Sequence, residues 1–141
     1  FSKKQIISLL RLSKVLIKKY KINIKNILGH SDVAPERKKD PGEKFPWEYL
    51  SKNRVGLWHT EKKKKLLKNR TIKTTNIDKE LFFNNLFKIG YSKKIPKNMS
   101  KVRYKAFIIK AFQRRYRQEL INVKIDKECL LISQNLIKKK Y

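Results

Sequence analysis

Apolar residues recur at the spacing of an α-helix near the start of the chain. Ser2 and Gln5 stand three positions apart, as in a capping box, where each side chain accepts a hydrogen bond from the backbone N–H of the other. The apolar positions that follow fall on a single stripe: Ile6, Leu9, Leu10, Leu16, Ile17 and Tyr20. Residues 2–20 are therefore predicted to form an amphipathic helix.

Three segments in the C-terminal half show the same spacing. Each follows a residue that commonly caps a helix N-terminus, namely Asn76, Ser100 or Asp126, and Gly90 is a stop signal for the first of them. Their apolar positions are Leu81, Phe82, Leu86 and Ile89, then Val102, Ala106, Ile109, Phe112, Tyr116 and Leu120, then Leu130, Leu131, Leu136 and Ile137. Residues 76–141 are therefore predicted to form a three-helix unit.

The middle of the chain has a different pattern. NILGH, residues 26–30, is a short apolar run that we predict to be a buried strand ending at His30. Prolines and glycines then enforce an irregular loop, with a helical turn or two at residues 47–53. The predicted fold class is α+β, with a first domain at residues 1–59, a basic linker at 60–75 and an all-α domain at 76–141.

The chain is extremely basic. It carries 38 Lys and Arg against 11 Asp and Glu in 141 residues, for a net charge of +27. Most of the cations are lysines and accompany many Ile and Asn residues, as an AT-rich coding sequence would produce, so we do not expect nucleic acid as the partner. Attraction to another polyanion stays open. The single cysteine, Cys129, excludes an internal disulfide, and no apolar run is long enough to span a membrane.

Candidate chemistry lies in GHSDVAPERKKDPG, residues 29–42. His30 and Asp40 are ligand types that zinc accepts, and Lys38 stands close enough in sequence to stabilise negative charge on an attacked amide. The spacing alone leaves an ordinary alternative open. His30 could be a hydrogen-bonded structural residue, and Asp40 could be a turn former before Pro41.

The same stretch, continued by FPWEYL and GLW at residues 45–50 and 56–58, closely resembles the zinc-dependent N-acetylmuramoyl-L-alanine amidases of the AmiD type. That family shares the fold of the peptidoglycan recognition proteins and carries GHSDIAP-x-RK-x-DPG followed by FPW. The resemblance implies that His30 and Asp40 are zinc ligands and that Lys38 assists catalysis. The implied reaction is hydrolysis of the amide between N-acetylmuramic acid and L-alanine.

The C-terminal unit also resembles a part of these enzymes. AFIIKAFQRRYR, residues 106–117, is similar to the three-helix peptidoglycan-binding module that follows the amidase domain, although a generic helical bundle would have the same core residues. The implied partners are peptidoglycan or muropeptides. The implied location is the bacterial cell envelope, either periplasmic or associated with the outer membrane.

The resemblance is incomplete at the predicted site. The family's first zinc-ligating histidine and its catalytic glutamate lie upstream of the matching motif, and this sequence holds no position for either. We therefore expect a fragment that is inactive alone and that a separate N-terminal amidase fragment could complement. We consider His59 as a substitute ligand and Glu36, Glu43 and Glu48 as substitute bases, but exposed linker and surface roles suit them better.

Two other functions remain open at this point. The chain could be a non-enzymatic peptidoglycan-binding protein in which only the helical unit works, or a polyanion binder driven by its lysines. Asp32, also within the motif, is expected to cap a turn or helix rather than to bind metal.

Overall fold

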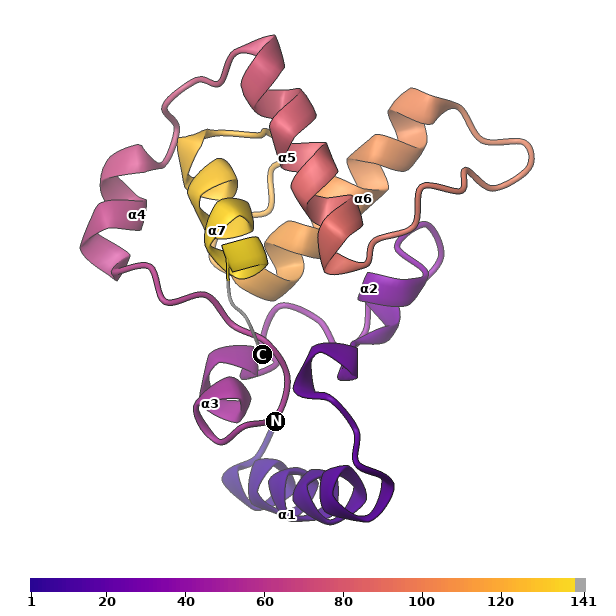
Figure 1. Ribbon diagram of the computed structural model, residues 1–141, viewed down its shortest axis with the longest axis vertical. Coiled ribbons are helices and arrows are strands. Elements are labelled where there is room, and N and C mark those ends of the chain that lie inside the picture. Colours follow the sequence, from indigo (N-terminus) through magenta and orange to yellow (C-terminus); the bar gives the residue numbers. More distant parts are fainter. Residues whose placement is uncertain (139–141) are drawn as a thin grey trace.

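The computed structural model describes residues 1–138, and these form helices and loops in two layers (Figure 1). The lower layer in the figure holds α1 (Lys3–Tyr20), the 3₁₀ helix η1 (Ile24–Asn26), α2 (His30–Val33) and α3 (Trp47–Lys52). The upper layer holds α4 (Lys63–Asn69), α5 (Asn76–Ile89), α6 (Lys101–Tyr116) and α7 (Lys127–Lys138).

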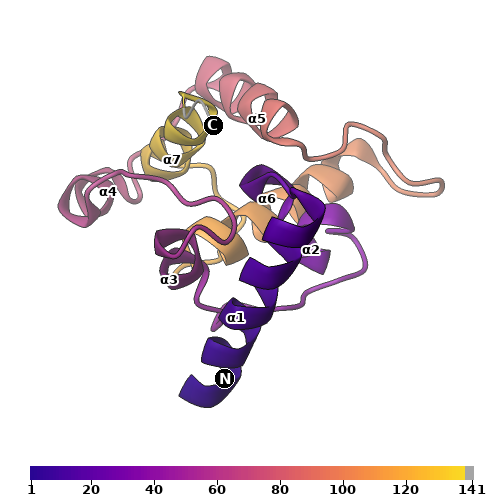
Figure 2. The ribbon, with the colours of Figure 1, turned by 60° about the horizontal axis from the view of Figure 1, so that its bottom comes forward.

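The predicted N-terminal helix is present as α1. Ser2 accepts a hydrogen bond from the Gln5 N–H, and the Gln5 side chain accepts one from the Ser2 N–H at 2.8 Å, so the predicted capping box is confirmed. One face of α1 packs through Leu10 against Leu50 and Val55. The other face leaves large apolar side chains exposed, namely Leu12, Val15, Leu16 and Tyr20. Figure 2 shows α1 in front of the other elements, with none of them covering it on this side.

The prediction of an α+β fold with a strand at residues 26–30 is wrong. No β-strand occurs within residues 1–138, and the only bridge is an isolated pair between Lys73 and Asp126. Ile27 and Gly29 do have extended backbone angles, but no described segment pairs with them. An extended run becomes a strand only through hydrogen bonds to a neighbouring strand, and the sequence pattern does not show whether that neighbour exists.

The helices α5, α6 and α7 enclose the larger hydrophobic core. Its centre is fully buried and consists of Phe82, Leu86, Ala111, Phe112, Cys129 and Ile132. Ser100 caps α6 as predicted, and the Asp126 carboxylate accepts from the Cys129 N–H at 3.0 Å at the start of α7. The cap of α5 lies one residue earlier than predicted, because Thr75 rather than Asn76 accepts from the Asp78 N–H.

The basic segment 60–75 contains α4, which packs on α7. Leu66 contributes to the main core, and Arg70 donates two hydrogen bonds to the buried carboxylate of Glu128. Thr60 also bonds Asn135 on α7. The helical layer therefore includes residues ahead of position 76.

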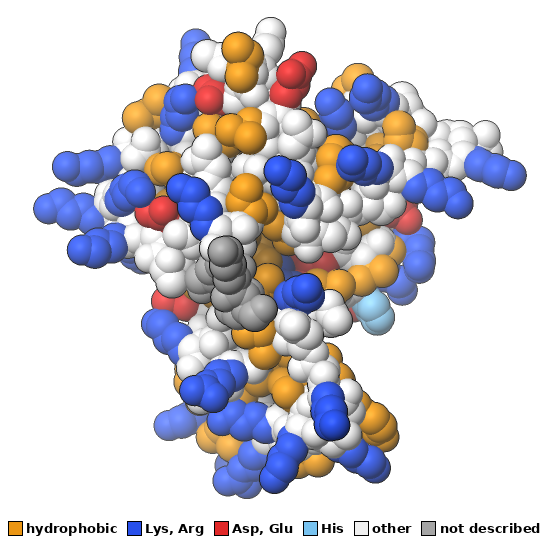
Figure 3. Space-filling view, viewed as in Figure 1, with side chains coloured by type: hydrophobic (Ala, Val, Ile, Leu, Met, Phe, Trp, Pro, Cys, Tyr) orange, Lys and Arg blue, Asp and Glu red, His pale blue; other side chains and the backbone are white. Residues whose placement is uncertain are grey.

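The surface is dominated by cations. Lysine and arginine side chains are spread over the face shown in Figure 3, between apolar and uncharged groups, and acidic groups are few among them. Within residues 1–138, none of the helices combines the length and the apolar character needed to cross a membrane.

Candidate metal centre

The turn that carries His30 is held together by its own residues. Gly29 is the N-cap of α2, and the Asp32 carboxylate accepts a hydrogen bond from the Gly29 N–H at 2.8 Å. Asp32 thus caps the helix, as expected from the sequence. His30 is the first residue of α2, so this one-turn helix fixes where its side chain begins.

A close approach of two backbone segments brings Asp40 to the same place. A Cβ atom on Gly29 would lie only 2.7 Å from Pro41 Cδ, so a glycine is needed for the two segments to touch. The Ser31 N–H then donates to the Asp40 carbonyl oxygen at 3.0 Å. The two candidate ligands therefore come from loops that are bonded to each other.

The side chains of His30 and Asp40 meet. Nδ1 of His30 lies 2.5 Å from Oδ2 of Asp40, and the side chains are 71% and 57% exposed. The hydrogen bond from His30 lowers the pKa of Asp40 below its ordinary value, and the charge of Lys38 adds to the effect. At neutral pH Asp40 is therefore a carboxylate, and it is hydrogen-bonded to the His30 ring.

These two groups fit part of a zinc site. An imidazole nitrogen and a carboxylate oxygen are both zinc ligands, and two ligand atoms on one tetrahedral ion lie about 3.4 Å apart. The pair would have to separate by roughly 1 Å, which exposed side chains can do by rotation. A zinc site needs at least three protein ligands, and no group of three His, Cys, Asp or Glu side chains is found in residues 1–138.

The Lys38 side chain is exposed, and its backbone N–H donates to the Ala34 carbonyl at 3.0 Å. The charge of Lys38 is the smallest of the causes that lower the pKa of Asp40. The catalytic role of Lys38 stays a prediction.

The other candidate ligands and bases are engaged elsewhere. Glu43 pairs with Arg114 at 3.3 Å and Glu48 with Lys52 at 2.8 Å, while Glu36 lies 3.7 Å from the neighbouring Arg37. The His59 ring stacks on Trp58, with ring centroids 4.9 Å apart, and lines an open pocket whose walls do not include His30 or Asp40.

The sequence did not identify two residues that support this turn, Tyr91 and Arg115. Asp32 also accepts a hydrogen bond from the Tyr91 hydroxyl at 3.0 Å and one from Arg115 Nη1. Burial and the Asp32 charge raise the pKa of Tyr91 well above its ordinary value of 10.0, so its hydroxyl stays a donor. The adjacent arginines near the end of residues 106–117 were a signal, but the pattern did not show which of them points inward.

Comparison with known proteins gives matches to one family. Residues 1–43 match the family model for N-acetylmuramoyl-L-alanine amidase. The chain is 32% identical over 142 aligned residues to the N-acetylmuramoyl-L-alanine amidase AmiD of Escherichia coli, covering 99% of this chain and 49% of AmiD. It is also 49% identical over 53 residues to the 1,6-anhydro-N-acetylmuramyl-L-alanine amidase AmpD of Haemophilus influenzae, covering 36% of this chain and 29% of AmpD.

Solved structures extend the likeness over both layers. The complex of Escherichia coli AmiD with anhydro-N-acetylmuramic acid-L-Ala-D-gamma-Glu-L-Lys superimposes with a TM-score of 0.79 at 32% identity, covering 98% of this chain and 52% of AmiD. AmpDh3 of Pseudomonas aeruginosa gives a TM-score of 0.77 at 28% identity, covering 98% and 54%. The chain thus spans about half the length of AmiD and AmpDh3.

Proposed function

Because this chain is similar to N-acetylmuramoyl-L-alanine amidases over nearly its whole length, we propose that it belongs to this family and supplies part of a zinc-dependent amidase site that cleaves the bond between N-acetylmuramic acid and L-alanine. The observation that carries the proposal is the convergence of His30 and Asp40, at 2.5 Å, within the motif. The muropeptide in the AmiD complex supports the substrate class.

His30 and Asp40 would hold the metal, and zinc, when bound, supplies a water of lowered pKa that can attack an amide at neutral pH. Asp40 enters as a carboxylate, since its pKa is lowered. To ligate through Nδ1, the His30 ring must carry its single proton on Nε2. Lys38 would stabilise the negative charge that develops on the amide oxygen.

This chain alone is proposed to have no appreciable amidase activity. Two ligands from residues 1–138 hold a metal less tightly than three, and a positioned general base typically contributes about 10²–10⁴-fold. The missing ligand and base would come from a further amidase segment, either fused or as a separate chain. We also propose a location in the bacterial cell envelope, where peptidoglycan is found.

The test joins this chain to the part of Escherichia coli AmiD that lies outside the match and measures zinc-dependent release of stem peptide from a muropeptide. We expect activity from the joined protein, none from His30→Ala or Asp40→Ala, and a reduced rate with zinc retained in Lys38→Ala. Chelator-sensitive hydrolysis by residues 1–141 alone would show that the site is complete without a further segment. A joined protein that binds zinc at other residues would contradict the assignment.

A non-enzymatic role in peptidoglycan binding is the second candidate, because only two candidate ligands meet in the described part of the chain. Sedimentation with purified sacculi at rising salt tests it. Binding that persists at high salt, where charges are screened, supports this role. Complete loss of binding at high salt would show that the chain, with its net charge of +27, binds sacculi only by nonspecific electrostatic attraction.

A further inference from the structure

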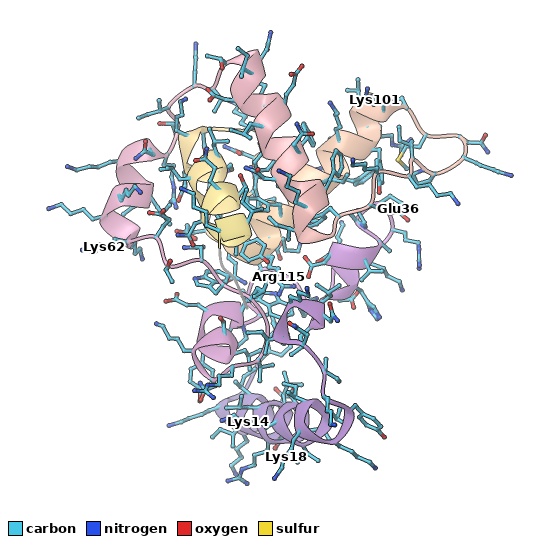
Figure 4. All side chains as sticks on the ribbon, viewed as in Figure 1. Lys14, Lys18, Glu36, Lys62, Lys101 and Arg115 are labelled. Carbon is cyan, nitrogen blue, oxygen red and sulfur yellow. The ribbon has the colours of Figure 1, made fainter. Side chains whose placement is uncertain are left out.

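A buried arginine of α6, Arg115, donates its side-chain hydrogen bonds to the layer that carries the motif. Arg115 has only 2% of its side chain exposed. Its Nη1 donates to the Asp32 carboxylate, and its Nη2 donates to the Ile27 carbonyl at 3.1 Å. Its guanidinium also lies over the Trp47 ring, 4.0 Å from the centroid. Figure 4 shows Arg115 where the two layers meet.

The carboxylate that Arg115 bonds is the one that caps the His30 turn. Asp32 is itself buried, and it accepts from the Gly29 N–H, so its position determines how α2 begins. The Ser31 N–H in the same turn holds the Asp40 carbonyl. Arg115 on α6 is therefore linked through the Asp32 carboxylate to the turn at residues 29–32, which carries His30 and whose Ser31 N–H holds the Asp40 backbone.

Neighbouring side chains of α6 add to the same contact. Arg114 Nε donates to Glu43 at 3.3 Å, and Gln118 Nε2, just beyond the helix, donates to the Phe45 carbonyl at 2.7 Å. Together with Arg115, these residues bind the loop on both sides of Asp40.

We infer that Arg115, acting through Asp32, is a positioning residue for the His30–Asp40 pair, so that the C-terminal helices act as the scaffold of the candidate metal centre. The role in metal binding rests on the function proposed above, but the positioning can be measured without metal. The physical reason is charge burial. If Arg115 is removed, the Asp32 carboxylate is left buried without its cation, which is strongly unfavourable, and the turn must open to water.

The chain offers a matched control. Arg117 lies two residues further on, is 1% exposed and is also paired with a carboxylate, Asp126, at 2.5 Å. Its other hydrogen bonds go to Leu120 and Asn122 in the loop between α6 and α7, and it also lies 3.5 Å from the Glu128 carboxylate on α7. Replacing Arg117 therefore removes a buried arginine of the same kind without touching the motif.

The experiment compares Arg115→Met and Arg117→Met in the whole chain by NMR. In Arg115→Met we expect amide exchange at Ser31 to rise about tenfold relative to amides of α7, and the His30 Nδ1 resonance to move. In Arg117→Met the exchange rate of the Ser31 amide should change by a factor within about twofold of the change at the α7 amides, and the His30 resonance should not move. An unchanged His30 resonance in Arg115→Met, or equal responses from both variants, would overturn the inference.

Two further measurements keep the test decisive. If Arg115→Met does not fold, Tyr91→Phe removes only one hydrogen bond to Asp32 and should shift the same two signals in the same direction by less; no shift would count against the inference. Zinc titration of the protein joined to the AmiD segment should give a dissociation constant at least about fivefold weaker with Arg115→Met but not with Arg117→Met. A joined protein with the wild-type residues that binds no zinc would contradict the proposed metal role, while the exchange and resonance data on this chain still decide the positioning.

Discussion

Replacing Arg70 by methionine should destabilise the C-terminal helices strongly. Arg70 follows α4 and donates to both carboxylate oxygens of Glu128, from Nε at 2.7 Å and Nη2 at 2.8 Å. The Glu128 side chain is only 1% exposed. Without Arg70, this carboxylate keeps one cation, Arg117, at the longer distance of 3.5 Å.

The magnitude follows from that remaining partner. Removing one member of a buried ion pair costs about 3–5 kcal/mol when the other charge is left alone. Arg117 still compensates part of the Glu128 charge, so we expect a loss of about 2–4 kcal/mol in the free energy of unfolding. Lys65→Met is the matched control on α4, because Lys65 contacts Glu61 at 2.8 Å with half of its side chain exposed. It should cost no more than about 0.5 kcal/mol.

Urea unfolding followed by circular dichroism measures both changes, provided that the slope with urea stays the same. The double variant Arg70→Met/Glu128→Leu should recover at least about 1 kcal/mol, since it removes the unpaired charge as well. The reasoning is refuted if Arg70→Met costs no more than Lys65→Met, or if the double variant is as unstable as the sum of its single changes.

The other predictions use local measurements. Gly29→Ala should cost about 1–3 kcal/mol and separate the metal-site loops, because its methyl group would meet Pro41 Cδ at 2.7 Å. Asp78→Asn should lower the free energy of unfolding at neutral pH, because the hydrogen bond from Lys127 lowers the pKa of Asp78 from 3.8 and so stabilises the folded state with the carboxylate ionised. The difference in unfolding free energy between the variant and the wild type should shrink as pH falls below about 3.8, where the carboxylate becomes protonated. Cys129 should not react with thiol reagents at pH about 8 until the helices open, since burial raises its pKa to about 12.

Each of these has a result that contradicts it. A Gly29→Ala protein with unchanged stability and an unmoved His30 resonance would mean that the loops can shift at no cost. If the difference in unfolding free energy between Asp78→Asn and the wild type is constant from neutral pH down to about pH 2, the ion pair with Lys127 does not contribute to the pH dependence of stability. Rapid native labelling of Cys129, at the rate of an unfolded chain, would show that the core opens freely.

The sequence alone was sufficient to predict those features of this protein that depend on residues close together in the chain. The capping of α1 by Ser2 and of α6 by Ser100 was readable because a cap joins residues only three positions apart. The helices themselves were readable for the same reason, since the period is set by neighbouring turns, but Tyr20 and Val102, both on predicted apolar stripes, are 62% and 80% exposed. The resemblance of the motif to amidases likewise predicted from the sequence that His30 and Asp40 belong to one candidate site.

The tertiary structure decided what depends on distant residues. An extended run at Ile27–Gly29 could not be told from a strand, because a strand is defined by a partner elsewhere in the chain. The bond between Asp32 and Arg115 joins residues 83 positions apart. Nothing in the sequence distinguishes Arg115 from Arg117. Only the packing of α6 against α2 directs Arg115 toward the motif and Arg117 into the helical layer.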